Sequence, residues 1–167
     1  MSIGKTNFST NPNQDSKNKY EDVNNLTNDN TNNLIGVLET QISVADIAYI
    51  YEGVKMGENV LKKIIEAHNE VLTHGLTKGT EMVVAIDLST GETVAKAYGT
   101  ETATKFSYED KNYQGKAVTI HNHTSSGSFT PTDLVTFSRD VNSHMSVIQA
   151  HNGKIYSLQK LNEVMPF

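Results

Sequence analysis

A chain of 167 residues is long enough for one domain of ordinary size together with flanking segments. Its net charge of -5 argues against a general nucleic-acid or anionic-membrane binder, because an acidic surface attracts neither polyanion. The absence of cysteine excludes disulfide bonds, cysteine-based zinc ribbons and thiol catalysis. Residues 1–8 contain no apolar signal-peptide region and no stretch reaches the length of a membrane span, so we expect a cytoplasmic protein, in the producing cell or in a host.

The first 33 residues differ in composition from the rest of the chain. Ten of them are Asn, most of the others are Ser, Thr, Lys or Asp, and apolar residues occur singly. Such a segment cannot bury enough apolar surface to offset the entropy that it would lose on ordering. We therefore predict that residues 1–33 form a disordered, Asn-rich arm. The alternative is a segment that becomes ordered when it meets a partner.

Residues 34–57 are predicted to form a helical extension. Ser43 is a candidate N-cap with Asp46 three residues later, and apolar residues follow at helical spacing. Gly53 and Gly57 leave open whether this helix continues into the next one.

The predicted domain covers residues 58–162 and begins with a long helix. Apolar residues over positions 61–72 repeat with the i, i+3, i+4, i+7 period of one helical face, and Gly75 is a candidate C-cap. His68 lies on this apolar stripe, where a packed histidine is a better interpretation than a ligand. His74, near the predicted helix end, is expected to place a favourable charge at the C-terminal dipole.

From residue 81 onward the apolar pattern changes to a period of two, which is typical of strands. Strands are expected at Met82–Ile86, Thr93–Tyr98, Ala117–Ile120, Met145–Ala150 and Lys154–Leu158, with a short helix marked by Leu134, Phe137 and Val141. The order helix, hairpin, strand, helix, hairpin predicts an α+β domain with a mixed sheet and its helices packed on it.

His121 and His123 follow directly on the third of these strands. Because residues i and i+2 of a strand point to the same side, both imidazoles can reach one metal ion while Asn122 faces away. Asp133 can supply a third ligand if the Gly- and Ser-containing loop 124–128 folds back toward the strand. Three protein ligands leave the fourth position of a tetrahedral zinc ion open, which is the arrangement of catalytic zinc sites.

A second interpretation of the same segment needs no metal. Thr130 is a candidate N-cap, Pro131 suits the first helical position, and Asp133 completes a pattern like a capping box. This interpretation does not explain why a strand would deliver two histidines to such a loop. Both interpretations stay open at this point.

Two short runs resemble the signature of the JAB/MPN (JAMM) zinc metalloprotease superfamily: His121-Asn122-His123 and Ser128-Phe129-Thr130-Pro131-Thr132-Asp133. That signature has a Glu on an early strand, then His-x-His, then Ser-x-x-Asp. The prokaryotic and phage subset, related to RadC-like domains, is the most similar, and the resemblance covers roughly residues 58–160. It implies a JAB/MPN-like mixed sheet with flanking helices, and a zinc-dependent hydrolase that cleaves a peptide or isopeptide bond.

The resemblance assigns a role to each matching position. His121, His123 and Asp133 correspond to the zinc ligands. Glu81, which opens the first strand, corresponds to the glutamate that acts as general base on the zinc-bound water. Thr130 corresponds to the serine whose hydroxyl helps to stabilise the oxyanion.

Several positions depart from the family pattern or have another interpretation. Without the resemblance, Glu81 would be interpreted as an ordinary exposed glutamate at a strand start, and Glu92 and Glu101 are the other candidates for the base. Thr124 stands where the family usually has Pro, and Thr130 replaces the serine. We expect these departures to affect rate and substrate more than metal binding.

The resemblance also implies a protein or peptide substrate, with ubiquitin-like proteins among the candidates, and a phage or mobile-element protein acting in the host cytoplasm. The competing hypothesis is a zinc-containing binding or virion-associated module without catalysis. An HNH nuclease is disfavoured, because its three letters stand for residues separated along a ββα-metal unit and because basic residues do not cluster here. His144 and His151 are expected at the surface.

Overall fold

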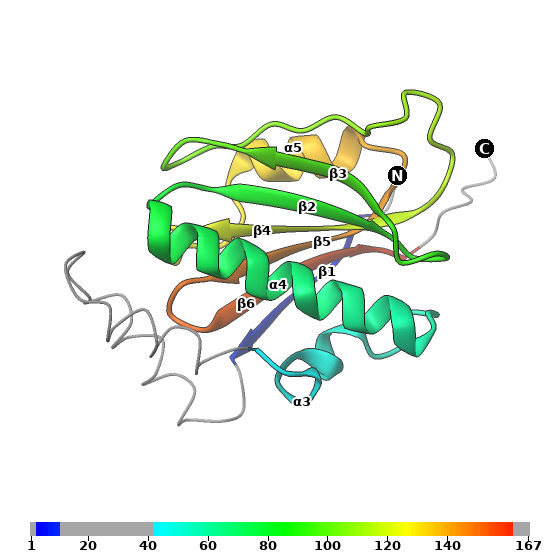
Figure 1. Cartoon of the computed structure of the whole chain (residues 1–167), viewed down its shortest axis with the longest axis horizontal. Helices are drawn as coiled ribbons and strands as arrows, with labels where there is room; N and C mark the ends of the chain where they lie inside the picture. The colour runs from blue at the N-terminus through cyan, green and yellow to red at the C-terminus, as the bar shows by residue number, and fades with distance from the viewer. Residues whose placement is uncertain (1–2, 11–41, 162–167) are drawn as a thin grey trace.

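The chain folds into one mixed sheet with helices on both faces, and the structure, a computed structural model, describes residues 3–10 and 42–161 (Figure 1). Its elements in chain order are β1 (Ile3–Thr10), α3 (Val44–Ile47), η1 (Ala48–Tyr51), α4 (Glu58–Lys78), β2 (Met82–Asp87), β3 (Thr93–Tyr98), β4 (Ala117–His123), α5 (Pro131–Arg139), β5 (Ser143–Ala150) and β6 (Lys154–Lys160). The strand order is β1-β6-β5-β4-β2-β3. Strands β4 and β5 are parallel and all other neighbours are antiparallel. The predicted α+β class with a mixed sheet is confirmed.

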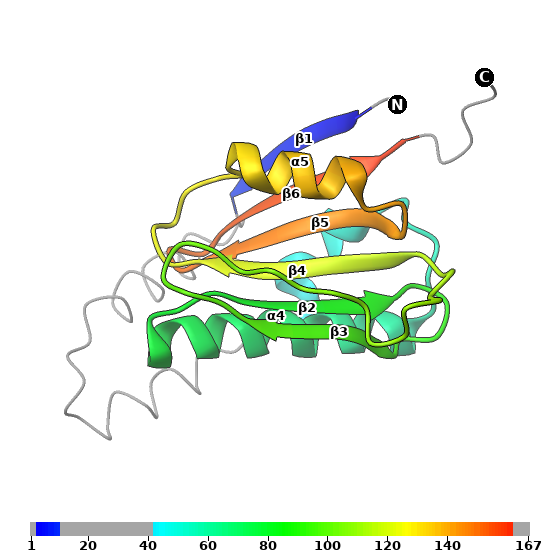
Figure 2. The same cartoon turned by 90° about the horizontal axis from the view of Figure 1, so that it is seen from above.

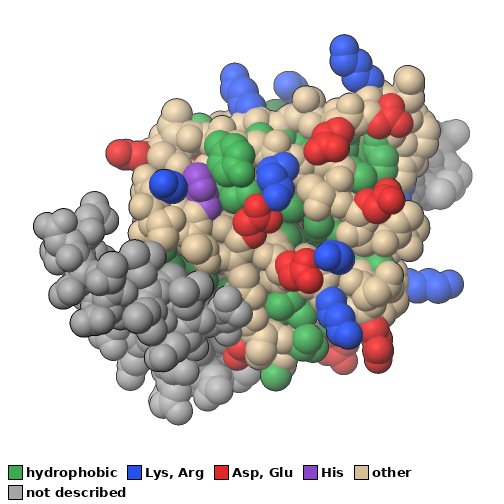
Figure 3. Space-filling model, viewed as in Figure 1, with side chains coloured by type: hydrophobic (Ala, Val, Ile, Leu, Met, Phe, Trp, Pro, Cys, Tyr) green, Lys and Arg blue, Asp and Glu red, His purple; other side chains and the backbone are tan. Residues whose placement is uncertain are grey.

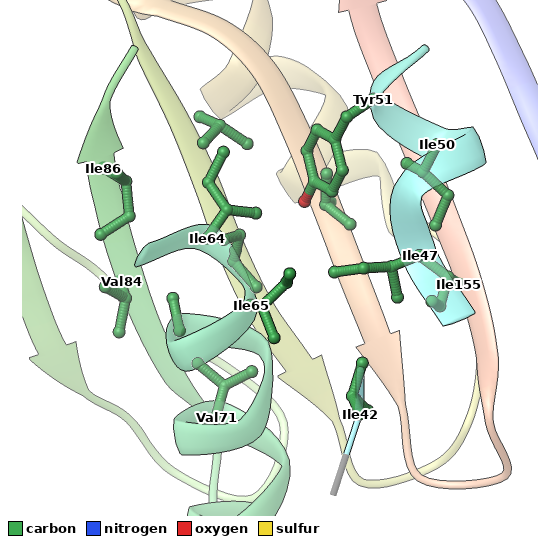
Figure 4. Packing of buried hydrophobic residues seen from close by; sticks show 14 of the residues in the cluster. Ile42, Ile47, Ile50, Tyr51, Ile64, Ile65, Val71, Val84, Ile86 and Ile155 are labelled. Atoms are coloured by element: carbon green, nitrogen blue, oxygen red, sulfur yellow. The ribbon is translucent and has the colours of Figure 1, made fainter. Parts of the chain in front are cut away.

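Helix α4 covers one face of the sheet (Figures 1 and 2). Its predicted apolar stripe buries Ile64 and Val71 completely, against Val84 of β2 and Ile120 of β4. Figure 4 shows side chains of the short helices, among them Ile47, pointing into the same core. Each fully buried aliphatic side chain stabilises the fold by about 1.5–3 kcal/mol relative to an exposed one. The largest part of the hydrophobic core therefore lies between α4, the short helices and this face of the sheet.

Helix α5 lies on the opposite face of the sheet and joins β4 to β5 (Figure 2). Parallel neighbouring strands need a crossover connection of this kind, because the chain must return to the end from which the first strand started. The helix therefore begins beside the C-terminal end of β4, where His123 lies. Its first turn, which contains Asp133, is brought to the same edge of the sheet as the two histidines.

Strand β1 corrects the prediction of an arm that is disordered throughout residues 1–33. Ile3–Thr10 pair with β6 in an antiparallel ladder, with Thr10 opposite Lys154 at one end. Edge pairing uses backbone N–H and C=O groups, so a polar segment with few apolar residues can still extend a sheet. The prediction considered side-chain burial alone. Residues 11–33 lie outside the described residues.

The described part of the predicted extension contains α3 and η1. Ser43 caps α3 as expected, and its N and Oγ both donate to Asp46 Oδ2, at 2.9 and 2.7 Å. Gly53 has φ +82° after η1, and Gly57 is the N-cap of α4, so the chain turns between the two helical segments. Residues 34–41 lie outside the described residues.

Helix α4 continues through Gly75, the predicted C-cap, and is capped instead by Gly79. Gly79 has φ +69°, the left-handed conformation that glycine adopts at helix ends, and its N–H donates to Gly75 O at 2.9 Å. Gly75 is needed for a different reason. A Cβ there would lie 2.3 Å from Asn122 Nδ2 and 2.2 Å from His151 Nε2. Only glycine allows these two side chains to pack against the helix.

The face that carries α4 shows acidic and basic side chains interspersed rather than separated by sign (Figure 3). Among the helices that the structure describes, none combines the length and the hydropathy that a membrane crossing requires.

His68 is packed inside the core, as its place on the apolar stripe predicts. Its exposed fraction is 0%. Its Nδ1 donates to Gln149 Oε1 at 3.0 Å, because that oxygen can only accept, and its Nε2 accepts from Tyr51 Oη at 2.6 Å. Both ring nitrogens are therefore satisfied by one neutral tautomer, and burial lowers the pKa of His68 to about 4, against a smaller raising effect of Gln149.

This network predicts a loss of stability in acid. The pKa of His68 is about 6.5 in the unfolded chain and about 4 in the folded one, so between these pH values only the unfolded chain takes up a proton there. The contribution of His68 to the free energy of unfolding is therefore fully present above pH 6.5 and is lost as the pH falls toward 4. The expected contribution of His68 is about 3 kcal/mol. Urea unfolding from pH 7 to pH 4 should show a flatter pH dependence for His68→Gln than for the wild type. Equal slopes for the variant and the wild type would contradict the assignment.

Candidate metal centre

Three of the predicted site residues meet at one edge of the sheet. His121 and His123 lie at the end of β4 and are 7% and 4% exposed, and Asp133 lies in the first turn of α5. One ligand atom from each residue lies within 4.8 Å of the other two. The structure therefore brings together the three residues that the sequence pattern selected.

The separations between these atoms suit a tetrahedral metal ion. His121 Nε2 lies 3.2 Å from His123 Nε2 and 3.6 Å from Asp133 Oδ1, and His123 Nε2 lies 3.5 Å from Asp133 Oδ2. Ligand bonds of about 2.0–2.1 Å around a tetrahedral zinc ion imply ligand–ligand distances of about 3.3 Å. The observed separations, in which each histidine faces a different oxygen of Asp133, are close to that value.

The loop after β4 fixes the tautomer of His123. Its Nδ1 lies 3.0 Å from the carbonyl oxygen of Gly127, which can only accept, so Nδ1 carries a proton and Nε2 is directed at the cluster. Ser126 has φ +58°, a left-handed conformation that is uncommon for a residue other than glycine. The turn that contains Ser126 places this carbonyl beside the ring, and a carbonyl partner on the other ring nitrogen is typical of metal-binding histidines.

The capping interpretation of Thr130 and Asp133 is correct. Thr130 N and Oγ1 both donate to Asp133 Oδ2, at 2.7 and 2.8 Å, and Asp133 N donates to Thr130 Oγ1 at 3.2 Å. The cap aims the carboxylate, whose Oδ1 faces His121. Capping and metal binding are therefore compatible functions of one side chain. The predicted oxyanion role of Thr130 stays a prediction, because its hydroxyl proton is donated to Asp133 here.

The charges in the cluster favour a bound cation. Burial and, to a smaller extent, the neighbouring His123 lower the pKa of His121 to about 4 against a raising effect of Asp133, so its ring is uncharged at neutral pH. Burial alone would lower the pKa of His123 too, but its hydrogen bond to Asp133 and the charges of Asp133 and Glu81 raise it. The carboxyl of Asp133 has a pKa well below its usual range, because the hydrogen bond from His123, the charge of His121 and the Thr130 bonds outweigh burial. Both shifts favour positive charge beside the carboxylates of Asp133 and Glu81.

Glu81 lies beside this cluster and is buried. Its backbone precedes β2 and is paired with the chain after β3, through Glu81 N to Thr100 O and Gly99 N to Glu81 O, both at 2.8 Å. Its side chain is 8% exposed, and its Oε1 lies 4.0 Å from His123 Nε2. Burial raises the pKa of the Glu81 carboxyl to about 7; His123 opposes this effect and Asp133 adds to it. An ordinary exposed glutamate at a strand start, the other interpretation, is not what the structure contains.

The two other candidate bases lie elsewhere. Glu92 is in the turn at the opposite end of the β2–β3 hairpin from Glu81. Glu101 is exposed, and its backbone oxygen accepts a hydrogen bond from Thr124 Oγ1 at 2.8 Å.

Two predictions about histidines outside the cluster are wrong. His151, expected to face solvent, is buried, and its Nε2 lies 3.1 Å from Asn122 Nδ2. His74 was expected to be charged, but burial and the charge of Lys78 lower its pKa, against a smaller raising effect of Glu70. His74 Nε2 lies 2.8 Å from Thr80 Oγ1. Sequence reasoning also missed the role of Asn122, whose sequence signal is an amide side chain between the two histidines of one strand.

A cavity of about 330 Å³ adjoins the cluster. His121 and Asp133 form one end of it, and it extends between the sheet, helix α5 and the segment 103–106. Phe106 and Phe137 give it an apolar wall. The buried hydroxyl of Thr104, which also lines it, has no hydrogen-bond partner among the residues that the structure describes.

Comparison of the chain with protein-family models, with curated proteins and with solved structures finds no match. The residues and geometry of the site are therefore the basis for assigning a function.

Proposed function

We propose that this protein is a zinc-dependent hydrolase of the JAMM type that cleaves a peptide or isopeptide bond. The observation that carries the proposal is the meeting of His121, His123 and Asp133 at distances that suit a tetrahedral ion, with the buried carboxyl of Glu81 next to them. The set of two imidazoles and one carboxylate is typical of zinc, and it leaves one coordination position free. The resemblance of the two sequence runs to the JAB/MPN signature supports the same fold family and activity.

Each side chain has a distinct task in the proposed reaction. His121, His123 and Asp133 would hold the ion, which supplies positive charge that lowers the pKa of water toward ~7. Glu81 takes a proton from the attacking water and passes it to the nitrogen of the leaving amine as the C–N bond breaks. Its buried position beside His123 suits this task, because the carboxyl is held next to the place where the water would bind.

The cavity beside His121 and Asp133 would take the part of the substrate next to the scissile bond. Its apolar wall suits an uncharged side chain, and the unpartnered hydroxyl of Thr104 offers a hydrogen bond to the substrate backbone. We expect a protein or peptide substrate on these grounds. Ubiquitin-like C-terminal tails are among the candidates that the family resemblance implies.

The proposal is tested by hydrolysis with the purified protein loaded with one equivalent of Zn²⁺. Two probes are offered: a mixture of fluorescence-quenched peptides, and ubiquitin carrying a fluorogenic amide at its C-terminus. We expect hydrolysis that a chelator abolishes and that added zinc restores. Protein that holds one zinc ion and hydrolyses neither probe would favour the alternative, a binding or virion-associated module with an idle zinc site.

The role of the cavity leads to a prediction about Thr136. This exposed residue of α5 lines the cavity, one helical turn after Thr132, which also lines it. A Thr136→Trp substitution should fill part of the cavity and lower kcat/KM on the hydrolysed probe at least about tenfold, with zinc affinity unchanged. Val135→Trp is the matched control, because Val135 is exposed on the same helix and does not line the cavity. Equal activity of the two variants would contradict a role of the cavity in substrate binding.

A further inference from the structure

Asn122 lies between the two histidines on β4 but faces the other side of the sheet. Its exposed fraction is 0%, and its side chain packs against Gly75 of α4. A primary amide in such a place must find partners for one acceptor and two donor protons, or it costs stability.

The amide of Asn122 holds the backbone on both sides of Glu81. Asn122 Oδ1 accepts from Met82 N at 2.7 Å, and Asn122 Nδ2 donates to Thr80 O at 3.1 Å. The orientation of the amide is unambiguous, since a backbone N–H can only donate and a carbonyl can only accept. The residue that follows Glu81 and the one that precedes it are thus both bonded to one side chain.

These bonds take over where the backbone ladder stops. The pairing of β2 with β4 ends at Val83 opposite His121. Beyond that pair, the side-chain amide of Asn122 bonds to the carbonyl of Thr80 and the N–H of Met82, the residues on either side of Glu81. The backbone of a parallel neighbouring strand would bond to the same two groups. On the other side Thr100 O and Gly99 N bind Glu81 itself. The Glu81 backbone is therefore held from both sides although Glu81 lies just before the first residue of β2.

Asn122 is held in turn by the second contact of its Nδ2. That atom lies 3.1 Å from His151 Nε2, so its second proton has an acceptor. The missing side chain of Gly75 makes room for both groups. Both amide protons and the amide oxygen of Asn122 therefore have partners, which favours a single arrangement of the side chain.

We propose that Asn122 is a positioning residue that sets the place of the Glu81 carboxylate relative to His121 and His123. His121, Asn122 and His123 are consecutive on β4. This one strand therefore places the two histidines on one face of the sheet, and on the other face it holds the backbone of Glu81 through the side chain of Asn122. This inference rests on the proposed function, because it gives Glu81 a task.

The test uses Asn122→Leu, which keeps the approximate side-chain volume and removes the bonds to Met82 and Thr80 together with the contact to His151. Asn69→Leu is the matched control: Asn69 accepts from Ile42 N at 2.7 Å and donates to Ile42 O at 2.9 Å, a similar amide-to-backbone contact on α4 that involves none of the site residues. Both variants should lose stability in urea unfolding. Only Asn122→Leu should lower kcat on the hydrolysed probe, by about 100-fold, with zinc affinity unchanged.

A double-mutant cycle separates positioning from general destabilisation. If Asn122 acts through Glu81, adding Asn122→Leu to Glu81→Gln should change kcat by less than about twofold, since the positioned group is already absent. The Co²⁺-loaded proteins give a second readout that needs no substrate. We expect the visible spectrum of Asn122→Leu to change in the direction of Glu81→Gln, the double variant to match Glu81→Gln, and Asn69→Leu to match the wild type.

The outcomes distinguish this inference from the proposed function. A Glu81→Gln variant as active as the wild type overturns the proposed base. An impaired Glu81→Gln beside an unimpaired Asn122→Leu overturns only the positioning role, as do additive losses in the cycle. Should Asn122→Leu fail to fold, amide hydrogen exchange of Met82 in the wild type decides, because an N–H bonded to buried Asn122 should exchange only through large-scale opening. Rapid exchange there would overturn the inference.

Discussion

Replacing Asp133 by Asn is expected to lower zinc affinity by more than about 100-fold, since loss of a partner of a ligand alone costs ~10–100-fold. The substitution removes the anionic ligand and leaves the two imidazoles, and an amide oxygen is a weaker ligand for zinc than a carboxylate. Competition with a zinc-sensitive dye measures the affinity directly.

The second capping box of the chain supplies the control for this prediction. Asp46 accepts from Ser43 N and Oγ with nearly the same geometry as Asp133 does from Thr130. Asp46→Asn should weaken a helix cap, a loss of about 1 kcal/mol, without changing zinc affinity. If Asp133→Asn behaves in the same way, Asp133 is a cap and nothing more.

Glu81→Gln is expected to lower kcat by about 10²–10⁴-fold while the protein keeps one zinc ion. Gln has nearly the shape of Glu but cannot accept a proton, and Glu81 lies outside the set of three ligands, 4.0 Å from His123 Nε2. Steady-state hydrolysis and elemental analysis of the same preparation give the two quantities.

Glu101→Gln is the control for the base, because Glu101 is an exposed carboxylate from the segment after β3 and its backbone oxygen bonds to Thr124 near the site. Its activity should equal that of the wild type. Wild-type turnover by Glu81→Gln, or a large loss in Glu101→Gln, would show that the base has been assigned to the wrong residue.

The sequence predicts those parts of the site that depend on short-range rules. Alternation along a strand places His121 and His123 on one face, and the cap pattern at Thr130 locates the start of α5. The crossover between parallel strands then brings Asp133 to the histidines. Strand β4 was predicted to end at Ile120, but it keeps its extended pairing through His123, beyond its last apolar residue.

The parts that the sequence does not predict depend on contacts between distant segments. Gly75 has the features of a helix end, but its neighbours in space are Asn122 and His151, and these keep it inside the helix. The local sequence predicts an exposed side chain for Glu81 at the start of a strand, whereas the fold buries Glu81 beside the cluster. Strand β1 forms through backbone pairing that side-chain composition does not indicate.

The JAB/MPN resemblance and the structure bear on different parts of the account. The resemblance supplies the proposed reaction and the metal. The structure supplies the meeting of the three candidate ligands, the buried position of Glu81 and the contacts of Asn122, none of which depends on the resemblance.

Anomalous diffraction at the zinc edge from crystals grown with equimolar Zn²⁺ tests the central claim most directly. We predict one strong peak about 2.0–2.1 Å from His121 Nε2, His123 Nε2 and a carboxylate oxygen of Asp133. A peak at other residues, or no peak from protein in which those three side chains are well ordered, would contradict the assignment of this edge of the sheet as a metal centre.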